Sequence, residues 1–561
     1  MKRLQYKLGI IILFSICYFA PAITDAKSMD LFSSSSKTKA KKFVDNKYVR
    51  FKDSTKVQTE ITKFYRNREN HLAWVQNGQL NQNGRDLLRL IKNADKEGLS
   101  PEFYNYTEIT AKLKQMQTKQ HTLYDNAELD YMLTNAYMKY ASDISTGRVN
   151  PGDLNVIWEI HKEEHEYSTY LEKALQHNSL EKSLKDLRPK HKQYELLIDA
   201  YKQLSELRNE GGWSLPGEDV PRLEQNDSVP EVISIKKRLA TSGYLLSSND
   251  VYLNDELFDE QLTNALKSFQ RAHGLDDDGI VGKNTLRELN KPVEYRLAQI
   301  KLNIDRLRWL PESVGERDII VNIPDFKLQY FDNNQLRDEM AVVVGETSNY
   351  TPALKDTITY IVINPTWNVP WSIATKEMLP KTKADPTYLS LNNFKLVRGS
   401  YASTDVVDPQ RVDWSKISAR NFPFSIIQKP GYGNALGRVK FMLPNNQNIY
   451  LHDTPADHLF SRTERDFSHG CVRLEKPFQL AETILEGQVT PQEFRRKLNS
   501  GKTESVVLNK PVPVHLIYRT AWIDDYGTMQ FRKDIYGFDE RSMPVLDIIS
   551  QPLATKEAGD L

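Results

Sequence analysis

The sequence predicts a multidomain α+β protein with a helical N-terminal part and a mainly-β C-terminal part. At 561 residues the chain is too long for one hydrophobic core, so several domains are expected. Apolar residues recur at helical spacing through most of residues 46–291, and short β-branched or aromatic runs dominate from about residue 317 onward. Clusters of Gly and Pro separate these regions, as is typical of domain boundaries.

The charge balance argues against a nucleic-acid partner. The chain has 75 basic and 74 acidic residues, a formal net charge of +1, and this balance gives no electrostatic field that would hold a polyanion. Partners must therefore be inferred from motifs.

Residues 1–26 have the order of features of a secretory signal peptide. Basic residues precede an apolar run, Leu8 to Ala20, which gives way to small residues. The run is shorter than the ~20 residues that a membrane-spanning helix needs. We expect export and cleavage; an uncleaved segment would instead tether the exported protein to the membrane. Cleavage removes Cys17 and leaves Cys471 with no partner for an internal disulfide.

Residues 27–45 are rich in Ser and Lys and are expected to form a flexible linker. A helical domain is predicted over residues 46–215. Within it, one amphipathic helix is expected from Asn83 to Ala94 and another from Leu129 to Ala141.

Residues 229–291 are predicted to form a compact unit of three short helices. The first is centred on Val232 to Leu239, the second ends near Gly274, and the third follows the turn in DDDGIVGKNT. With its FQRAHGL and DGIVGKNT segments, this unit resembles the small three-helix peptidoglycan-binding module of bacterial wall enzymes. The resemblance implies that it binds glycan strands.

After a helical connector that ends at Arg308–Trp309, short strands are predicted to form a sandwich or barrel over residues 317–510. The predicted strands are DIIVNI, KLQYF, MAVVVG, YIVINP, RVKFML and NIYLHD. A less regular insert, about residues 367–401, is expected to cover an active site. Two more strands within residues 511–561 are expected to pack on this domain.

The stretch that carries chemistry runs from Tyr450 to Pro477. A helix is predicted from Lys476 to Leu485, and a cysteine just before a helix start lies near unpaired N–H groups that favour a thiolate. A neighbouring imidazole can take the proton of such a thiol. His452 ends a predicted strand and can be brought back over Cys471 by a loop. His469, only two residues before Cys471, is poorly placed to do so.

This stretch resembles the catalytic segment of the L,D-transpeptidases, a His followed after about 16 residues by Ser/Thr-His-Gly-Cys. Ser468 follows His452 by 16 positions, and His469, Gly470 and Cys471 complete the pattern. The signal, helical domain, binding module and TWNVPWSI, KPGYGNALGRVKF and HDTP segments resemble the family's long Gram-negative members, which implies a periplasmic enzyme.

The resemblance implies a mechanism and a set of roles. Cys471 would attack the amide before the terminal D-Ala of a peptidoglycan stem tetrapeptide, His452 would be the general base and then the acid, and a second stem would resolve the thioester into a 3→3 cross-link. Backbone N–H groups of Cys471 and Gly470 would hold the oxyanion, and Ser468 and His469 would orient the loop. Carbapenems are the expected inhibitors, and no cofactor or metal is expected. The residues expected to bind substrate are Arg473, Trp367, Trp371, Gly433 and Asn434.

Other functions stay open at this point. Water as acceptor would give a carboxypeptidase or endopeptidase, and another amine could attach a protein to the wall. A non-catalytic wall-binding protein would use residues 229–291 alone. His161, Glu164 and His165 have the H-x-x-E-H order of a zinc protease, but their flanks are highly charged and no third ligand is evident.

Overall fold

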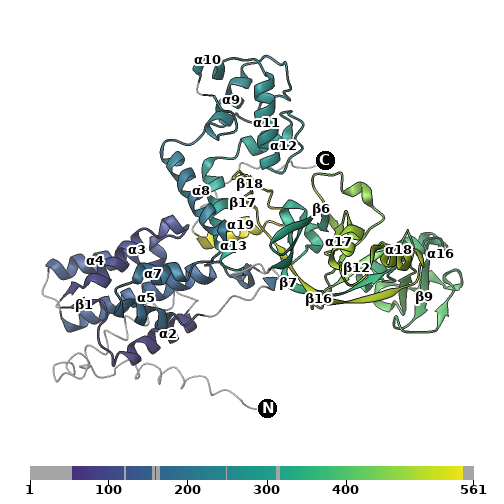
Figure 1. Cartoon of the computed structure of the whole chain (residues 1–561), viewed down its shortest axis with the longest axis horizontal. Helices are drawn as coiled ribbons and strands as arrows, with labels where there is room; N and C mark the ends of the chain where they lie inside the picture. Colours follow the sequence, from purple (N-terminus) through teal and green to yellow (C-terminus); the bar gives the residue numbers. More distant parts are fainter. Residues whose placement is uncertain are drawn as a thin grey trace, which may run out of the picture.

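The computed structural model describes residues 54–546 except 77, 119–121, 155–157, 160–164, 248 and 311–315. Figure 1 shows three bodies that radiate from a common centre: a helical body, a small helical module and a β-rich body that ends in a second lobe. The expected signal peptide (1–26), linker (27–45), His161 and Glu164 lie outside the described residues. Within the described part, no helix is both long and apolar enough to cross a membrane.

The helical body is built around one long buried helix, α5. The Asp130 carboxylate on α5 accepts hydrogen bonds from the backbone N–H groups of Ala73, Trp74 and Val75, which fixes the chain before a small hairpin. The predicted helix at residues 83–94 is α3. The elements are α2 (Ser54–Asn67), β1 (Val75–Gln76), β2 (Gln79–Leu80), α3 (Gln82–Lys92), α4 (Tyr106–Thr118), α5 (Leu123–Thr146), α6 (Tyr167–Gln176) and α7 (Leu180–Asp186).

A central body joins the three arms (Figure 1). It consists of α8 (Lys192–Asn209), α13 (Val293–Leu307), the hairpin β17 (Ala521–Ile523) with β18 (Met529–Phe531), and α19 (Phe538–Ser542). The apolar faces of α8, α13 and the hairpin form one cluster. The expected helical domain, residues 46–215, thus includes one helix, α8, whose apolar face packs in the central body. Of the two strands expected after residue 510, the first begins within β16 and pairs in the catalytic sheet up to Ile517, whereas β17 and β18 pack on helices.

The small module contains the three expected helices and one extra turn of helix, α9 (Glu231–Thr241), α10 (Asp250–Leu253), α11 (Glu260–Ala272) and α12 (Lys283–Leu289). It is attached to the central hairpin through Arg532, which donates to the carbonyl of Ala272 and to Asp325 at the edge of the β-rich body. A Cβ at Gly274 would lie 2.5 Å from the Arg532 side chain, so glycine allows this close approach.

The β-rich body is a ten-stranded mixed sheet that closes on itself. Its order is β12-β13-β15-β6-β5-β4-β16-β7, and β7 pairs again with β12. Residues Trp158–Glu159 form β3, which adds to β7, and β14 pairs with β6. The main strands are β4 (Arg317–Asn322), β5 (Lys327–Asp332), β6 (Gln335–Gly345), β7 (Ala353–Ile363), β12 (Val439–Met442), β13 (Leu451–His452), β14 (Asp466–Ser468), β15 (Val472–Leu474) and β16 (Glu504–Ile517).

Alternation of apolar and polar residues explains which face of this barrel is buried. Ile319, Val321, Leu328, Val514 and Leu516 are fully buried in one core, which also takes the apolar side of α17 (Pro477–Ile484) and α18 (Pro491–Asn499). The long strand β16 runs through residue 510, so the expected domain boundary there does not coincide with a structural one.

The segment expected to be an irregular insert is a folded lobe with its own core. It extends from Trp367 to about Gln428, beyond the expected end at residue 401. Its sheet has the order β10-β9-β11-β8, and its elements are β8 (Trp367–Asn368), α14 (Trp371–Ile373), the π-helical turn Ala374–Met378, α15 (Leu379–Ala384), α16 (Tyr388–Leu391), β9 (Phe394–Arg398), β10 (Val406–Val407) and β11 (Phe424–Gln428). The predicted multidomain α+β fold class is confirmed.

Candidate active site

His452 ends β13, and Cys471 directly precedes β15, the parallel strand beside it. The register pairs Leu451 with Val472 and His452 with Arg473. Leu451 and Val472 point into the barrel core, where both are fully buried. Because side chains alternate along a strand and paired residues share a face, Cys471, two positions before Arg473, lies on the same outer face as His452.

The neighbouring strand β12 adds a lysine to this face. Lys440 pairs with His452, so Lys440, His452 and Arg473 form a row across three adjacent strands, which we call the cationic row. The Lys440 Nζ lies 3.6 Å from the centre of the Tyr450 ring. Neither Lys440 nor Arg473 forms an ion pair with a described residue, and the Arg473 Nε is buried without a hydrogen-bond partner.

The His452 ring is held in a single orientation. Its Nδ1 lies 2.5 Å from the carbonyl oxygen of Asp453, and because that oxygen can only accept, Nδ1 carries the proton and Nε2 keeps its lone pair. Burial lowers the pKa of His452 to about 3, with smaller contributions from the charges of Arg473 and Lys440. The ring is therefore neutral at neutral pH, the form in which it can accept a proton.

The Cys471 thiol is partly exposed, and its Sγ lies 3.6 Å from the carbonyl oxygen of Asn448. Burial raises the pKa of Cys471, while hydrogen bonds from Tyr450 and the charges of Lys440 and Arg473 act in the opposite direction. The expected helix N-terminus beside the sulfur was wrong, because β15 follows Cys471 and α17 begins only at Pro477. The resting sulfur is therefore a protonated thiol that needs a base.

Hydrogen bonds fix the turn before the cysteine. The Ser468 hydroxyl donates to the Cys471 carbonyl at 2.6 Å and accepts the Gly470 N–H at 3.1 Å. Thr351 donates to the Gly470 carbonyl, and Gly470 has a φ of +111°, which favours glycine. The Gly470 N–H is thus occupied, which does not fit the expected oxyanion role. The Cys471 N–H has no hydrogen bond to a described residue.

The His469 side chain reaches the second lobe. Its Nε2 lies 2.6 Å from the Glu377 carboxylate on the π-helical turn. This geometry agrees with a role in orienting the loop, which stays a prediction.

Three family models match the chain, and their positions coincide with the bodies seen in the structure. A scaffold domain matches residues 59–200, a "Putative peptidoglycan binding domain" matches residues 228–289, and an L,D-transpeptidase catalytic domain matches residues 316–496. The last of these ranges contains the cationic row and the cysteine turn. The chain contains an L,D-transpeptidase catalytic domain.

One curated relative is similar to this chain over part of its length. A Haemophilus influenzae protein named "Putative L,D-transpeptidase" is 40% identical over 244 residues, which span 43% of this chain and 48% of the relative. The match thus covers about half of the relative's length.

Solved structures align more weakly. An L,D-transpeptidase from Xylanimonas cellulosilytica is 13% identical and covers 54% of this chain and 100% of that one, with a TM-score of 0.16. One from Enterococcus faecium is 12% identical and covers 56% and 100%, with a TM-score of 0.17. TM-scores this low carry no argument about the site.

The residues that were expected to bind substrate occupy different environments in the structure. Asn434 is fully buried, donates to the carbonyls of Pro365 and Lys429 and accepts from the Leu436 N–H. This position does not fit a substrate-binding role. The adjacent Gly433 is exposed, and its carbonyl accepts from Gln428 within the same loop.

The two tryptophans belong to the second lobe. Trp367 packs against that lobe's own core, whereas Trp371 on α14 is 57% exposed. A contact of Trp367 or Trp371 with substrate stays a prediction.

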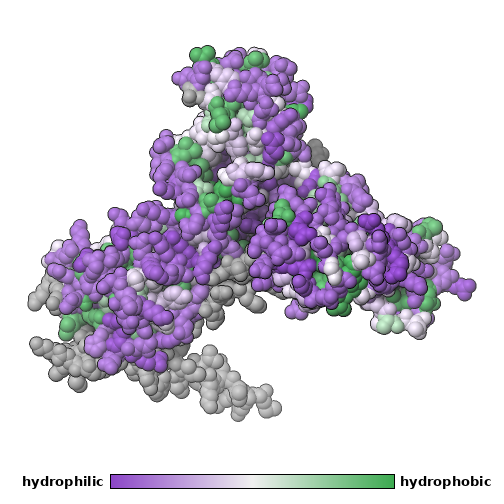
Figure 2. All heavy atoms as spheres, viewed as in Figure 1, coloured by the Kyte–Doolittle hydropathy of each residue, from purple (hydrophilic) through white to green (hydrophobic). Residues whose placement is uncertain are grey.

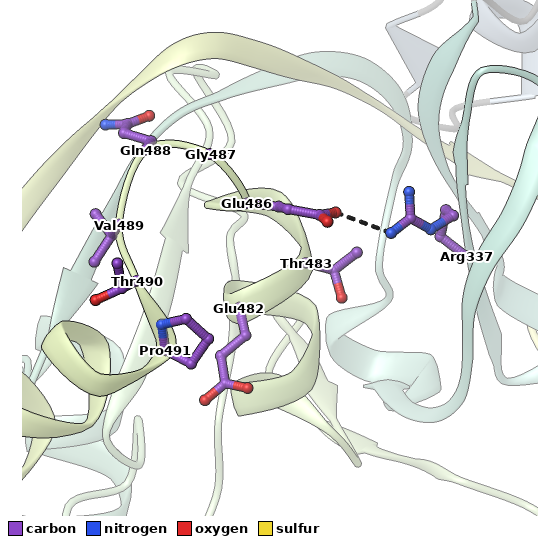
Figure 3. A pocket seen from close by; sticks show the side chains of 9 residues that line it. All are labelled: Arg337, Glu482, Thr483, Glu486, Gly487, Gln488, Val489, Thr490 and Pro491. Carbon is purple, nitrogen blue, oxygen red and sulfur yellow. Dashed lines mark hydrogen bonds and ion pairs between the residues drawn. The ribbon is translucent and has the colours of Figure 1, made fainter.

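A hollow of about 490 Å³ lies beside the α17–α18 connection (Figure 3). The Arg337 guanidinium crosses it to Glu486 at 2.9 Å. No expected site residue lines this hollow, so it is separate from the chemistry.

Sequence reasoning missed Lys440, Tyr450 and Glu377. Lys440 stands between the apolar residues Val439 and Phe441 in the predicted strand RVKFML, and Tyr450 lies two positions before His452. Period-two alternation could therefore have placed both side chains outside the core. Glu377 gave no such signal. Within the described part, no group of three or more His, Cys, Asp or Glu side chains could hold a metal.

Proposed function

We propose that this chain is an exported peptidoglycan L,D-transpeptidase that forms 3→3 cross-links through a thioester on Cys471. The observation that carries the proposal is the shared strand face of Cys471 and His452, with the His452 Nδ1 proton committed to the Asp453 carbonyl. The matches to a peptidoglycan-binding domain and a transpeptidase domain support a cell-wall substrate and a wall-associated, periplasmic location.

In the first half of the reaction, His452 Nε2 takes the Cys471 proton as the sulfur attacks the carbonyl carbon of the residue before the terminal D-Ala. A carbon–sulfur bond forms, and the carbonyl oxygen becomes an oxyanion near the Cys471 N–H. When the carbon–nitrogen bond breaks, the proton on His452 passes to the departing amine of D-Ala. The products are free D-Ala and a thioester.

In the second half, an amine on the side chain of another stem attacks the thioester. His452 removes a proton from this amine and returns it to the Cys471 sulfur, which restores the thiol. Water in place of the amine would give a carboxypeptidase or endopeptidase, and an amine of a protein would give attachment to the wall, because the acceptor enters after the acyl-enzyme has formed.

The decisive experiment is incubation with purified tetrapeptide muropeptides followed by mass analysis. Cross-linked dimers with released D-Ala support the transpeptidase, and tripeptides alone favour the hydrolase. A non-catalytic binding protein would leave the muropeptides unchanged. Activity lost to a chelator and restored by zinc would favour a metal enzyme that uses His161 and His165.

A further inference from the structure

Two cations flank the proposed base without an anion to balance them. Lys440 and Arg473 are both half-buried, and neither forms an ion pair with a described residue. Burial opposes the charge on each, because it lowers the pKa of both Lys440 and Arg473. Half-buried charges without an opposite charge nearby are unfavourable unless a ligand supplies one, so this row is arranged for an anion.

The position of the row restricts which anion it can take. Lys440 and Arg473 are the direct neighbours of His452 on the strands to either side, and adjacent strands lie only ~4.8 Å apart. An anion held between or above the two cations therefore lies beside the His452 ring. The group that receives the His452 proton must lie there too.

We propose that Lys440 and Arg473 bind the terminal carboxylate of the donor stem peptide and thereby select donors that end in a free D-amino acid. The inference rests on the function proposed above and adds a specificity element to it. In the leaving residue, one carbon separates the carboxylate from the scissile nitrogen. Cations next to His452 hold this carboxylate at the place that brings the nitrogen to His452 Nε2.

The arrangement also links substrate binding to chemistry. In the free enzyme, the positive charges of Arg473 and Lys440 oppose protonation of His452. A bound carboxylate offsets these charges, so His452 accepts the thiol proton more readily once a donor is in place. The thiol is thus activated mainly in the complex.

Tyr450 connects Lys440 to the nucleophile. Its ring lies under the Lys440 ammonium, and Tyr450 lies close enough to Cys471 to lower the pKa of the thiol. Lys440 is therefore a positioning and specificity residue, since it acts on the carboxylate and, through Tyr450, on the sulfur's surroundings.

The test compares one tetrapeptide donor as the free acid with the same peptide as the C-terminal carboxamide. The carboxamide cannot form the charge-assisted contacts that the carboxylate makes with the two cations. The wild type should therefore prefer the acid by a factor on the order of 10² in kcat/KM. Lys440→Gln should reduce this ratio to below about 10, mainly by raising KM for the acid, and Lys440→Arg should restore it. Lys355→Gln, an exposed lysine on β7 of the same barrel, is the matched control and should keep the wild-type ratio.

The ratio is measured within one preparation, so a partly misfolded variant does not distort it. Arg473→Lys, which keeps the charge but loses the planar fork, is the second variant and should give an intermediate ratio. Equal use of acid and amide by the wild type overturns the inference but leaves the proposed function intact. A wild-type ratio in Lys440→Gln overturns the role of Lys440. Absence of turnover with either donor contradicts the proposed function itself.

Discussion

His469 and Glu377 form the direct bond between the cysteine turn and the second lobe, with the His469 Nε2 lying 2.6 Å from the Glu377 carboxylate. Both side chains are a little over 40% exposed, so the bond is accessible to solvent. It holds the turn that carries Cys471 to the lobe that carries Trp371. The position of the second lobe relative to the cysteine turn therefore depends on this contact.

Glu377→Gln should raise KM for muropeptides roughly three- to tenfold with a smaller change in kcat. Exposed ion pairs contribute little to folding, so the free energy of unfolding should change by less than about 1 kcal/mol. Steady-state kinetics and denaturant unfolding measure both. Glu486→Gln, which breaks an exposed ion pair with Arg337 at the remote hollow, is the control. An equal loss in both variants would argue against a role for the lobe contact.

Cys471→Ala should abolish turnover without unfolding the protein, because it removes a partly exposed sulfur rather than part of the barrel core. A carbapenem presents a strained carbonyl to the same nucleophile. Intact-protein mass spectrometry should show one carbapenem adduct on the wild type and none on Cys471→Ala. An adduct that persists without Cys471 would identify a different nucleophile.

His452 should make the stability of the protein depend on pH. Its pKa is about 3 in the folded protein and ~6.5 in the unfolded chain, so below pH 6.5 only the unfolded chain takes up the proton. The free energy of unfolding should therefore fall as the pH drops from about 6.5 toward 3, by up to ~1.4 kcal/mol per unit from this group. His452→Gln should show a shallower decline in denaturant unfolding between pH 7 and pH 5.

The same His452 variant should acylate more slowly, by a factor on the order of 10²–10⁴. His469→Ala should be the milder lesion, and the reverse order would mean that the base has been misassigned. Parallel pH profiles of stability for wild type and His452→Gln would contradict the buried neutral ring.

Asn434→Ala should destabilise the fold rather than impair substrate binding. The substitution leaves the carbonyls of Pro365 and Lys429 and the N–H of Leu436 without their partner, a loss of about 1–3 kcal/mol. Asn509→Ala, at an exposed position of β16, should change stability by less than about 0.5 kcal/mol. An unchanged midpoint of denaturant unfolding together with a raised KM would instead support a role for Asn434 in substrate binding.

The tip of the small module should contribute to wall binding. Leu246 and Val251 are 88% and 82% exposed there, and Figure 2 shows hydrophobic atoms at this end of an otherwise polar surface. Replacing both by Ser should weaken co-sedimentation with purified sacculi, whereas Leu391→Ser on the second lobe should not. Point changes are preferable to deletion, because His273 of the module stacks on Phe531. Unchanged co-sedimentation of the double variant would mean that another surface binds the wall.

Local sequence signals predicted those parts of the fold that depend on neighbouring residues. The six predicted strands all exist, and the helix expected at Lys476–Leu485 is α17 at Pro477–Ile484. Closure of the sheet through β7 and β12, and the recruitment of α8 to the central body, depend on contacts between distant segments. Single-sequence periodicity does not report such contacts. The second lobe was missed as a folded unit because its strands are short and lie between one-turn helices.

The same distinction applies to the site. His452 and Cys471 were predicted from a spacing that can be read along the chain. Lys440 and Arg473 become neighbours of His452 only through strand register, and Glu377 reaches His469 across 92 positions of sequence. The expected helix dipole at Cys471 was wrong because a three-residue strand too short to show periodicity separates the cysteine from the helix.

The close packing of Gly274 against Arg532 has a consequence for where the enzyme works. Because the module is packed against the central body in this way, a glycan strand bound to it, as the resemblance implies, would lie at a fixed distance from Cys471. The enzyme would then fix the distance between the bound glycan strand and the site of reaction. New cross-links would form at a constant distance from the glycan strand that the module binds. Replacing Gly274 by a larger residue would make this distance more variable before it lowered the rate of the reaction.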